Sequence, residues 1–233
     1  MEIVPILVYA LVAFFPAALW LTFFLREDDH AEPISLLTKT FLLGAAMSVP
    51  ALLVQMFFER MIGDRTAVMF LSMFLFAGVE ELAKFLGAYS AVLGRPEFDE
   101  PIDGMIYLIV AGLGFATVEN VFVLSSFYNA TSLVEMLGAG QALILRLIGA
   151  TLLHTLASAL AGYYWAHGIV AGESKRFIVV GLVVATLVHG IFNYLIYIWQ
   201  FSNLLLPSLF LVGITFFVLS DFEKIKREGG REV

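Results

Sequence analysis

The chain has 233 residues, of which 61% are hydrophobic and only 14% are charged, with a formal net charge of -7 and a mean hydropathy of +0.92. A soluble domain would carry roughly 25% charged residues, so the composition excludes an ordinary water-soluble fold and predicts an all-α, polytopic membrane protein. The sequence has no cysteine, which excludes disulfides and cysteine chemistry, and it has no basic patch of the kind that binds nucleic acid.

Seven mostly apolar stretches follow one another along the chain, each close to the length of about 20 residues that crosses a bilayer. The first stretch has no basic residue ahead of it and stays apolar to Leu25, so we expect a membrane span there rather than a cleaved signal peptide. Together the seven stretches predict one integral membrane domain over residues 1–233. We expect helices over 3–25, 35–58, 67–93, 101–126, 141–167, 176–199 and 203–220.

Basic residues are distributed unevenly between the two sides that these spans define. Lysine and arginine gather on the cytoplasmic side of membrane proteins, which predicts an outer N-terminus, a cytoplasmic C-terminus and a cytoplasmic tail over about 221–233. Only Arg60 and Arg65 then lie outside. The residues placed inside are Arg26, Lys39, Arg95, Lys175, Arg176, Lys224, Lys226, Arg227 and Arg231.

The third span contains charged residues in the middle of its apolar run, 71-LSMFLFAGVEELAKFLGAYSAVLG-94. An ionisable residue at such depth costs at least ~2.5 kcal/mol and usually faces the protein interior or water. Glu80 lies four residues before Lys84 and Glu81 lies three before it, so either glutamate can pair with the lysine on one helix face. The other glutamate then points about 100° away, toward a different neighbour.

The later spans also carry polar residues at helical spacing. Counted at ~1.5 Å per residue from the outer end of each span, Glu81 and His154 lie about 20 Å deep, His189 about 15 Å and Glu119 about 10 Å. We therefore expect these side chains to meet in the middle to outer half of the bilayer. The further polar residues inside spans are Asp103, Asn120, Arg146, Ser158 and Asn193.

Each of these residues alone has a structural explanation. A glutamate and Lys84 can form an ion pair, His154 can pack as a neutral core side chain, and His189 with Asn193 can join helices. We assign Asp103, at a helix start, and Arg146 to structure.

The combination of polar residues favours chemistry over structure. Three carboxylates, two histidines and an amide exceed what packing needs. A carboxylate in a water-poor site acts as a general base on water, and imidazoles and an amide can hold the water, stabilise an oxyanion or bind a metal. The set therefore predicts a water-activating centre.

Four motifs in order resemble the PrsW family of intramembrane proteases. The stretch 80-EELAK-84 resembles that family's EExxK motif, and 99-DEPIDGMIYLIVAGLGFATVEN-120 resembles its second block, with Phe115 and Glu119 as the F-x-x-x-E element. The stretches 153-LHTLASALAGYYWA-166 and 189-HGIFNYL-195 resemble its two histidine blocks. The resemblance covers about residues 75–196 and implies a protease core over about 67–199.

The resemblance implies a protease of the cell membrane that cuts a membrane-anchored protein, such as an anti-sigma factor, on its extracytoplasmic side. The expected partners are a single-span protein substrate and the lipid bilayer, with no nucleic acid. One of the paired glutamates is expected to be the general base. The predicted catalytic residues are Glu80, Glu81, Glu119, His154, His189 and Asn193, with Lys84 in support.

The sequence leaves the role of a metal open. Glu119, His154 and His189 have the side chains to supply three ligands to zinc, with water in the fourth position. Equally, a glutamate can activate water directly, with the histidines and Asn193 as hydrogen-bonding partners.

Two other functions are compatible with the same residues. The related CAAX prenyl proteases carry EExxxR, FxxxH and HxxxN motifs; this chain has Lys84 one position before that arginine and Glu119 in place of that histidine, although Asn193 matches their asparagine. The other alternative is a non-catalytic membrane scaffold or a transporter. Transporters are often built from internal repeats, and none is evident in this sequence.

Overall fold

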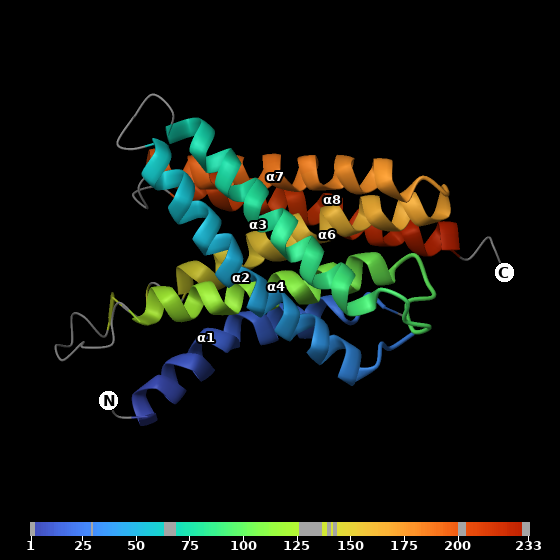
Figure 1. The fold of residues 1–233 in the computed structure, drawn as a ribbon, viewed down its shortest axis with the longest axis horizontal. Coiled ribbons are helices and arrows are strands. Elements are labelled where there is room, and N and C mark those ends of the chain that lie inside the picture. The colour runs from blue at the N-terminus through green and yellow to red at the C-terminus, as the bar shows by residue number, and fades with distance from the viewer. Residues whose placement is uncertain are drawn as a thin grey trace.

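The computed structural model describes residues 3–28, 30–62, 69–125, 137–138, 141, 144–199 and 204–229, and the regular structure of these residues is helical (Figure 1). A short π-helical segment, η2, leads directly into α6. The elements are α1 (Ile3–Phe24), α2 (Ile34–Ile62), α3 (Met69–Val92), α4 (Asp103–Ser125), η2 (Arg146–Ala150), α6 (Thr151–Val170), α7 (Ser174–Trp199) and α8 (Leu205–Gly229).

The α-helices of the described residues correspond one to one with the seven predicted stretches, which confirms the all-α fold class. Most ends agree within about a turn. The main difference is α8, which continues past the predicted end at residue 220 to Gly229, so much of the predicted tail is helical. The polar side chains of 221-DFEKIKREGG-230 end the apolar run without ending the helix.

Four of these helices are long and apolar enough to cross a membrane: α2, α4, α7 and the Leu205–Arg227 part of α8. Helix α3 is of similar length but carries Glu80, Glu81 and Lys84 near its middle. The chain is therefore a multi-pass membrane protein, and the orientation with seven spans stays a prediction.

The helices run back and forth along the long axis of the molecule. The connections α1–α2, α3–α4 and α6–α7 lie at one end of the bundle together with the C-terminus, and the N-terminus lies at the opposite end (Figure 1). Each side chain in mid-helix is thus held at a fixed depth in the bundle.

Helices α4 and α6 form the centre of the bundle. Helix α4 packs against α1, α2, α3 and α6, and α6 packs against α7 and α8. Every residue over 103–116 and over 151–162 is buried. Helix α3 packs between α2 and α7, which places its glutamates beside the central pair.

Small residues allow the central helices to approach closely, as TM helices often do. A Cβ at Gly114 would overlap the carbonyl oxygen of Phe41 on α2, and a Cβ at Gly162 would lie 2.6 Å from the carbonyl oxygen of Gly104 on α4. Gly114 and Gly162 therefore lie at points where two helix backbones are in close contact. This packing holds the polar faces of α3, α4, α6 and α7 together.

Candidate active site

Glu81 and Lys84 in the middle of α3 form an ion pair, and Glu80 has a different partner. Lys84 Nζ donates to Glu81 Oε1 at 2.6 Å, and both side chains are at most 1% exposed. Of the two pairings that the sequence allows, the structure therefore adopts the one at i,i+3. Glu80 is left on the adjacent face of the helix.

Glu80 is held by one oxygen and leaves the other available. Its Oε1 accepts a hydrogen bond of 2.8 Å from Gln55 Nε2 on α2. Its Oε2 is buried and has no hydrogen-bond partner among the described residues, and it faces His189 Nε2 at 3.6 Å. That distance is too long for a hydrogen bond, so a buried acceptor faces a gap.

Glu81, which is paired with Lys84, orients His189 on α7. The Nδ1 atom of this histidine lies 2.6 Å from Glu81 Oε1. An ionised carboxylate only accepts hydrogen bonds, so Nδ1 carries the proton and donates it. The other ring nitrogen, Nε2, therefore presents a lone pair toward Glu80 Oε2.

His154 on α6 has a partner at each ring nitrogen. Its Nδ1 lies 2.9 Å from Lys84 Nζ, and its Nε2 lies 2.8 Å from Glu119 Oε2 on α4. An ammonium group only donates, so Nδ1 accepts and Nε2 carries the proton that goes to Glu119. The ring stands nearly perpendicular to that of His189, with centroids 5.0 Å apart.

Glu119 is fixed in turn by a cation from the π-helical segment. Arg146 Nη2 donates to Glu119 Oε2 at 2.9 Å, and Arg146 Nε donates to Asn120 Oδ1. The amide of Asn120 also donates to Thr151 Oγ1 on α6 at 3.2 Å. Arg146, assigned to structure from the sequence, therefore holds a carboxylate of the site.

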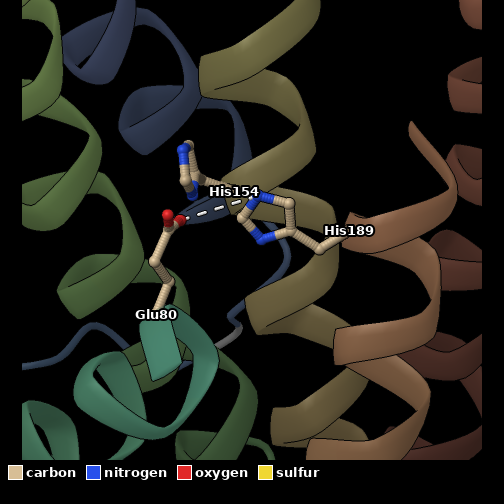
Figure 2. Close-up of side chains that lie close together, drawn as sticks. All are labelled: Glu80, His154 and His189. Carbon is tan, nitrogen blue, oxygen red and sulfur yellow. Dashed lines mark ion pairs between the residues drawn. The ribbon is translucent and has the colours of Figure 1, made fainter. Parts of the chain in front are cut away.

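Glu80, His154 and His189 form a group that could bind a metal ion (Figure 2). One ligand atom from each lies within 4.8 Å of the others, and one carboxylate with two imidazoles is a ligand set of catalytic zinc sites. The unpartnered Glu80 Oε2 and the lone pair of His189 Nε2 lie at about the spacing of two ligands on one ion, ~3.4 Å for bonds of ~2.1 Å. The donor set therefore suits zinc, although His154 would exchange one of its contacts for the ion.

The group differs by one residue from the zinc ligands expected from the sequence. Glu80 takes the place of Glu119, which instead contacts His154 and Arg146. Depth along a helix does not determine the direction of a side chain, and Glu119 faces the ring of His154 from the side of α4.

Asn193 lies one turn beyond His189 on α7 and lines a neighbouring cavity of about 660 Å³ together with Arg146. The structure thus brings the predicted residues Glu80, Glu81, Glu119, His154 and His189 into one cluster, in which Lys84 joins Glu81 to His154 and Glu80 approaches His189. Asn193 lies on the wall of the neighbouring cavity.

Gln55 is absent from the residues singled out by the sequence, although it contacts Glu80 directly. The available signal was a lone amide in the apolar run 51-ALLVQMFF-58, since polar groups within a span usually have a partner. Asp103 accepts hydrogen bonds from the backbone N–H groups of Asp99 and Glu100. It closes the turn before α4, in keeping with a structural role.

Comparison with known proteins points to the same family as the sequence motifs do. The family model described as PrsW family intramembrane metalloprotease matches residues 32–220. Protease PrsW of Geobacillus kaustophilus is 29% identical over 177 residues, which are 75% of this chain and 72% of that protein. Protease PrsW of Oceanobacillus iheyensis is 26% identical over 201 residues, 85% of this chain and 88% of that protein. Protease PrsW of Bacillus subtilis is 26% identical over 178 residues, 75% of each. No solved structure matches the chain.

Proposed function

The chain belongs to the PrsW family of intramembrane metalloproteases and is an intramembrane protease, and from this premise we propose that it cuts a membrane-anchored protein, such as an anti-sigma factor, near the extracytoplasmic side by means of water activated at Glu80. The observation that carries the proposal is the buried Glu80 Oε2, which has no hydrogen-bond partner among the described residues and lies 3.6 Å from His189 Nε2. Two acceptors across a short gap suit a bound water, which donates one proton to each.

The water held in this way attacks the carbonyl carbon of the scissile peptide bond. Its hydrogens are engaged by Glu80 and His189, so its oxygen lone pair is directed toward the substrate. Glu80 Oε2 takes the proton as the C–O bond forms. When the C–N bond breaks, the same proton passes from Glu80 to the departing amine, and the carboxylate is regenerated.

Glu81 and Lys84 act through the histidines rather than on the substrate. Glu81 holds His189 with its proton on Nδ1, and Lys84 holds His154 with its proton on Nε2. Gln55 fixes Glu80 through the oxygen that faces away from the gap. These contacts orient the reacting groups before substrate binds, which lowers the cost of reaching the transition state.

The tetrahedral intermediate carries a negative oxygen that needs donors in a water-poor site. We assign this role to the side-chain amide of Asn193, which lies on the wall of the cavity next to the site. Glu119 accepts hydrogen bonds from Arg146 Nη2 and from His154 Nε2, and these contacts keep the ring of His154 in place.

Glu80, His154 and His189 are the residues that would hold a zinc ion. A zinc held there would occupy the atoms of Glu80 and His189 that otherwise hold the water, and it would supply Lewis-acid activation of water in place of base catalysis by Glu80. Glu81 then has the role of the carboxylate that orients a metal-binding histidine.

The position of the site along the bundle supports cleavage on the extracytoplasmic side. Arg146, at the start of the η2–α6 helix, and Glu119, near the end of α4, lie toward the end of the molecule that holds the N-terminus. The distribution of lysine and arginine predicts that this end is extracytoplasmic. A site within the bundle also suits a substrate that reaches it from the bilayer.

The test is cleavage of a panel of tagged single-span proteins co-expressed with the wild-type chain or with Glu80→Gln, with the products mapped by mass. Glu59→Gln, an exposed glutamate on α2, is the matched control. We expect a cut on the extracytoplasmic side with the wild type and the control and none with Glu80→Gln. Cleavage that survives Glu80→Gln, or a cut on the cytoplasmic side, would contradict the proposal.

A further inference from the structure

A cavity of about 660 Å³ lies beside the candidate active site, between the end of α4, the π-helical segment and the facing parts of α7 and α8. These are the ends that lie toward the N-terminal end of the bundle in Figure 1. The volume is within the range of roughly 300–1,000 Å³ that ligand pockets have.

The cavity shares side chains with the network that holds the candidate site. Arg146 lines it and donates to Glu119, which contacts His154. Asn193 lines it one helical turn from His189, and Phe192 from the same helix forms part of its wall. A group seated in the cavity therefore lies against Asn193 and against Arg146, the partner of Glu119.

The chemistry of the wall indicates what the cavity binds. Most of the lining is apolar, with side chains such as Leu211, and Asn193 and Ser208 add an amide and a hydroxyl that can bond to a peptide backbone. Among the described lining residues the one charged side chain is the cation Arg146, and none is acidic. Such a wall favours an apolar side chain on a polypeptide and disfavours a lysine.

Gly149 is a position on the cavity wall where a Cβ atom can be added. It belongs to the π-helical segment, and among the described residues a Cβ placed on it would meet the ring of Phe192 alone, at the ordinary contact distance of 3.5 Å. The added Cβ does not overlap any described backbone atom. Because Gly149 lines the cavity, a larger side chain at this position would reduce the space in it.

We propose that this cavity binds the side chain of a substrate residue next to the scissile bond, that it selects large apolar side chains, and that Gly149 sets their size. The inference rests on the proposed function, since it assigns a specificity pocket to the same site. The occupant is the extracytoplasmic juxtamembrane segment of the membrane-anchored substrate. Arg146, which binds Glu119, and the backbone-bonding groups Asn193 and Ser208 lie on the wall, and they favour this occupant over a lipid chain.

The test uses the purified full-length chain in lipid nanodiscs and a single-span reporter that the wild type cuts. The residues on either side of the mapped cut are varied among Ala, Leu, Phe and Lys. For wild type we expect kcat/KM for Leu or Phe at one of the two positions to exceed that for Ala and for Lys by about tenfold or more, as for other hydrophobic pockets. Gly149→Leu should lower kcat/KM for the Leu and Phe reporters by about tenfold and change it less than about twofold for the Ala reporter.

Gly213→Leu is the matched control, because a Cβ at Gly213 on α8 meets no described residue within 4 Å and Gly213 is not among the described lining residues of the cavity. It should leave all reporters unchanged. Equal cleavage of all reporters by wild type would overturn the pocket. A loss of kcat/KM in Gly149→Leu that is equal for all reporters would also overturn the pocket. In both cases cleavage that depends on Glu80 persists and the proposed function stands; a wild type that cuts no reporter contradicts both.

A second measurement does not depend on the Gly149 variant. Ser208→p-benzoylphenylalanine, placed in the Glu80→Gln chain, puts a photocrosslinker on the cavity wall. Irradiation with the reporter should give an adduct at a residue beside the cut, identified by mass. Adducts with lipid alone would show that an acyl chain fills the cavity and would overturn the inference.

Discussion

The buried ion pair between Glu81 and Lys84 provides a quantitative test of how the site is held. Its two charges are 2.6 Å apart and at most 1% exposed. Lys84→Met removes one charge, leaves Glu81 ionised in an apolar interior and takes the donor from His154 Nδ1. Breaking a buried pair in this way costs about 3–5 kcal/mol, so we expect a loss of that size in the free energy of unfolding.

The double variant Glu81→Gln/Lys84→Met removes both charges and keeps an oxygen that can accept from His189 Nδ1. Its remaining cost is that of weakened hydrogen bonds, about 1–3 kcal/mol. The double variant should therefore be more stable than Lys84→Met by about 2 kcal/mol, and the double-mutant cycle should show strong coupling.

The assay is equilibrium unfolding of the purified chain in mixed micelles, followed by helicity. Arg176→Met is the control, since Arg176 and Glu173 form an i,i+3 pair that is well exposed and such pairs contribute at most about 1 kcal/mol. A double variant as unstable as the sum of its single variants, or a Lys84→Met loss no larger than that of Arg176→Met, would refute a tightly coupled buried pair.

Three further predictions concern the site and its packing. Gln55→Leu leaves Glu80 Oε1 without its donor, so kcat on a cleaved reporter should fall about tenfold to hundredfold with the cut site unchanged; an unchanged kcat would remove Gln55 from the site. Gly114→Val forces α2 and α4 apart and should cost about 1–3 kcal/mol or more in unfolding free energy, whereas Gly213→Val should cost much less; equal effects would contradict the close contact. Zinc added to the purified chain should bind to wild type and not to His189→Ala, measured by equilibrium dialysis and metal analysis, and binding that survives in the variant would place the zinc elsewhere.

The helices and most of the site could be predicted because the bilayer imposes a simple pattern. Every backbone polar group must be satisfied within lipid, so an apolar run of sufficient length becomes a helix. A charged residue such as Glu81 within such a run must also find a partner. Depth counted along each span then brings Glu81, Glu119, His154 and His189 to a common region, and the structure places them in contact.

The finer geometry could not be obtained from spacing. Both Glu80 and Glu81 are at helical distance from Lys84, and only the neighbours on other helices decide between them: His189 takes Glu81 and Gln55 takes Glu80. The exchange of Glu80 for Glu119 in the group that could bind a metal ion has the same origin, because the rotation of each helix is set by packing such as that at Gly114.

The C-terminal end of α8 could not be predicted from the hydropathy pattern. The apolar pattern ends near residue 220, but the helix continues to Gly229. Asp221 bonds to Lys224 one turn later, and Lys226 reaches Glu27 beside α1. A helix end outside the apolar run is fixed by such local and tertiary contacts, which the hydropathy pattern does not record.

The most direct test of the central claim is the rate of peptide hydrolysis by purified Glu80→Gln, measured on a reporter that the wild type cuts and compared with Glu59→Gln. General-base catalysis contributes about 10²–10⁴-fold, so the account predicts that Glu80→Gln is at least about a hundredfold slower while Glu59→Gln is unchanged. A Glu80→Gln chain that keeps its rate within about tenfold of wild type would contradict the assignment of Glu80 as the group that activates water.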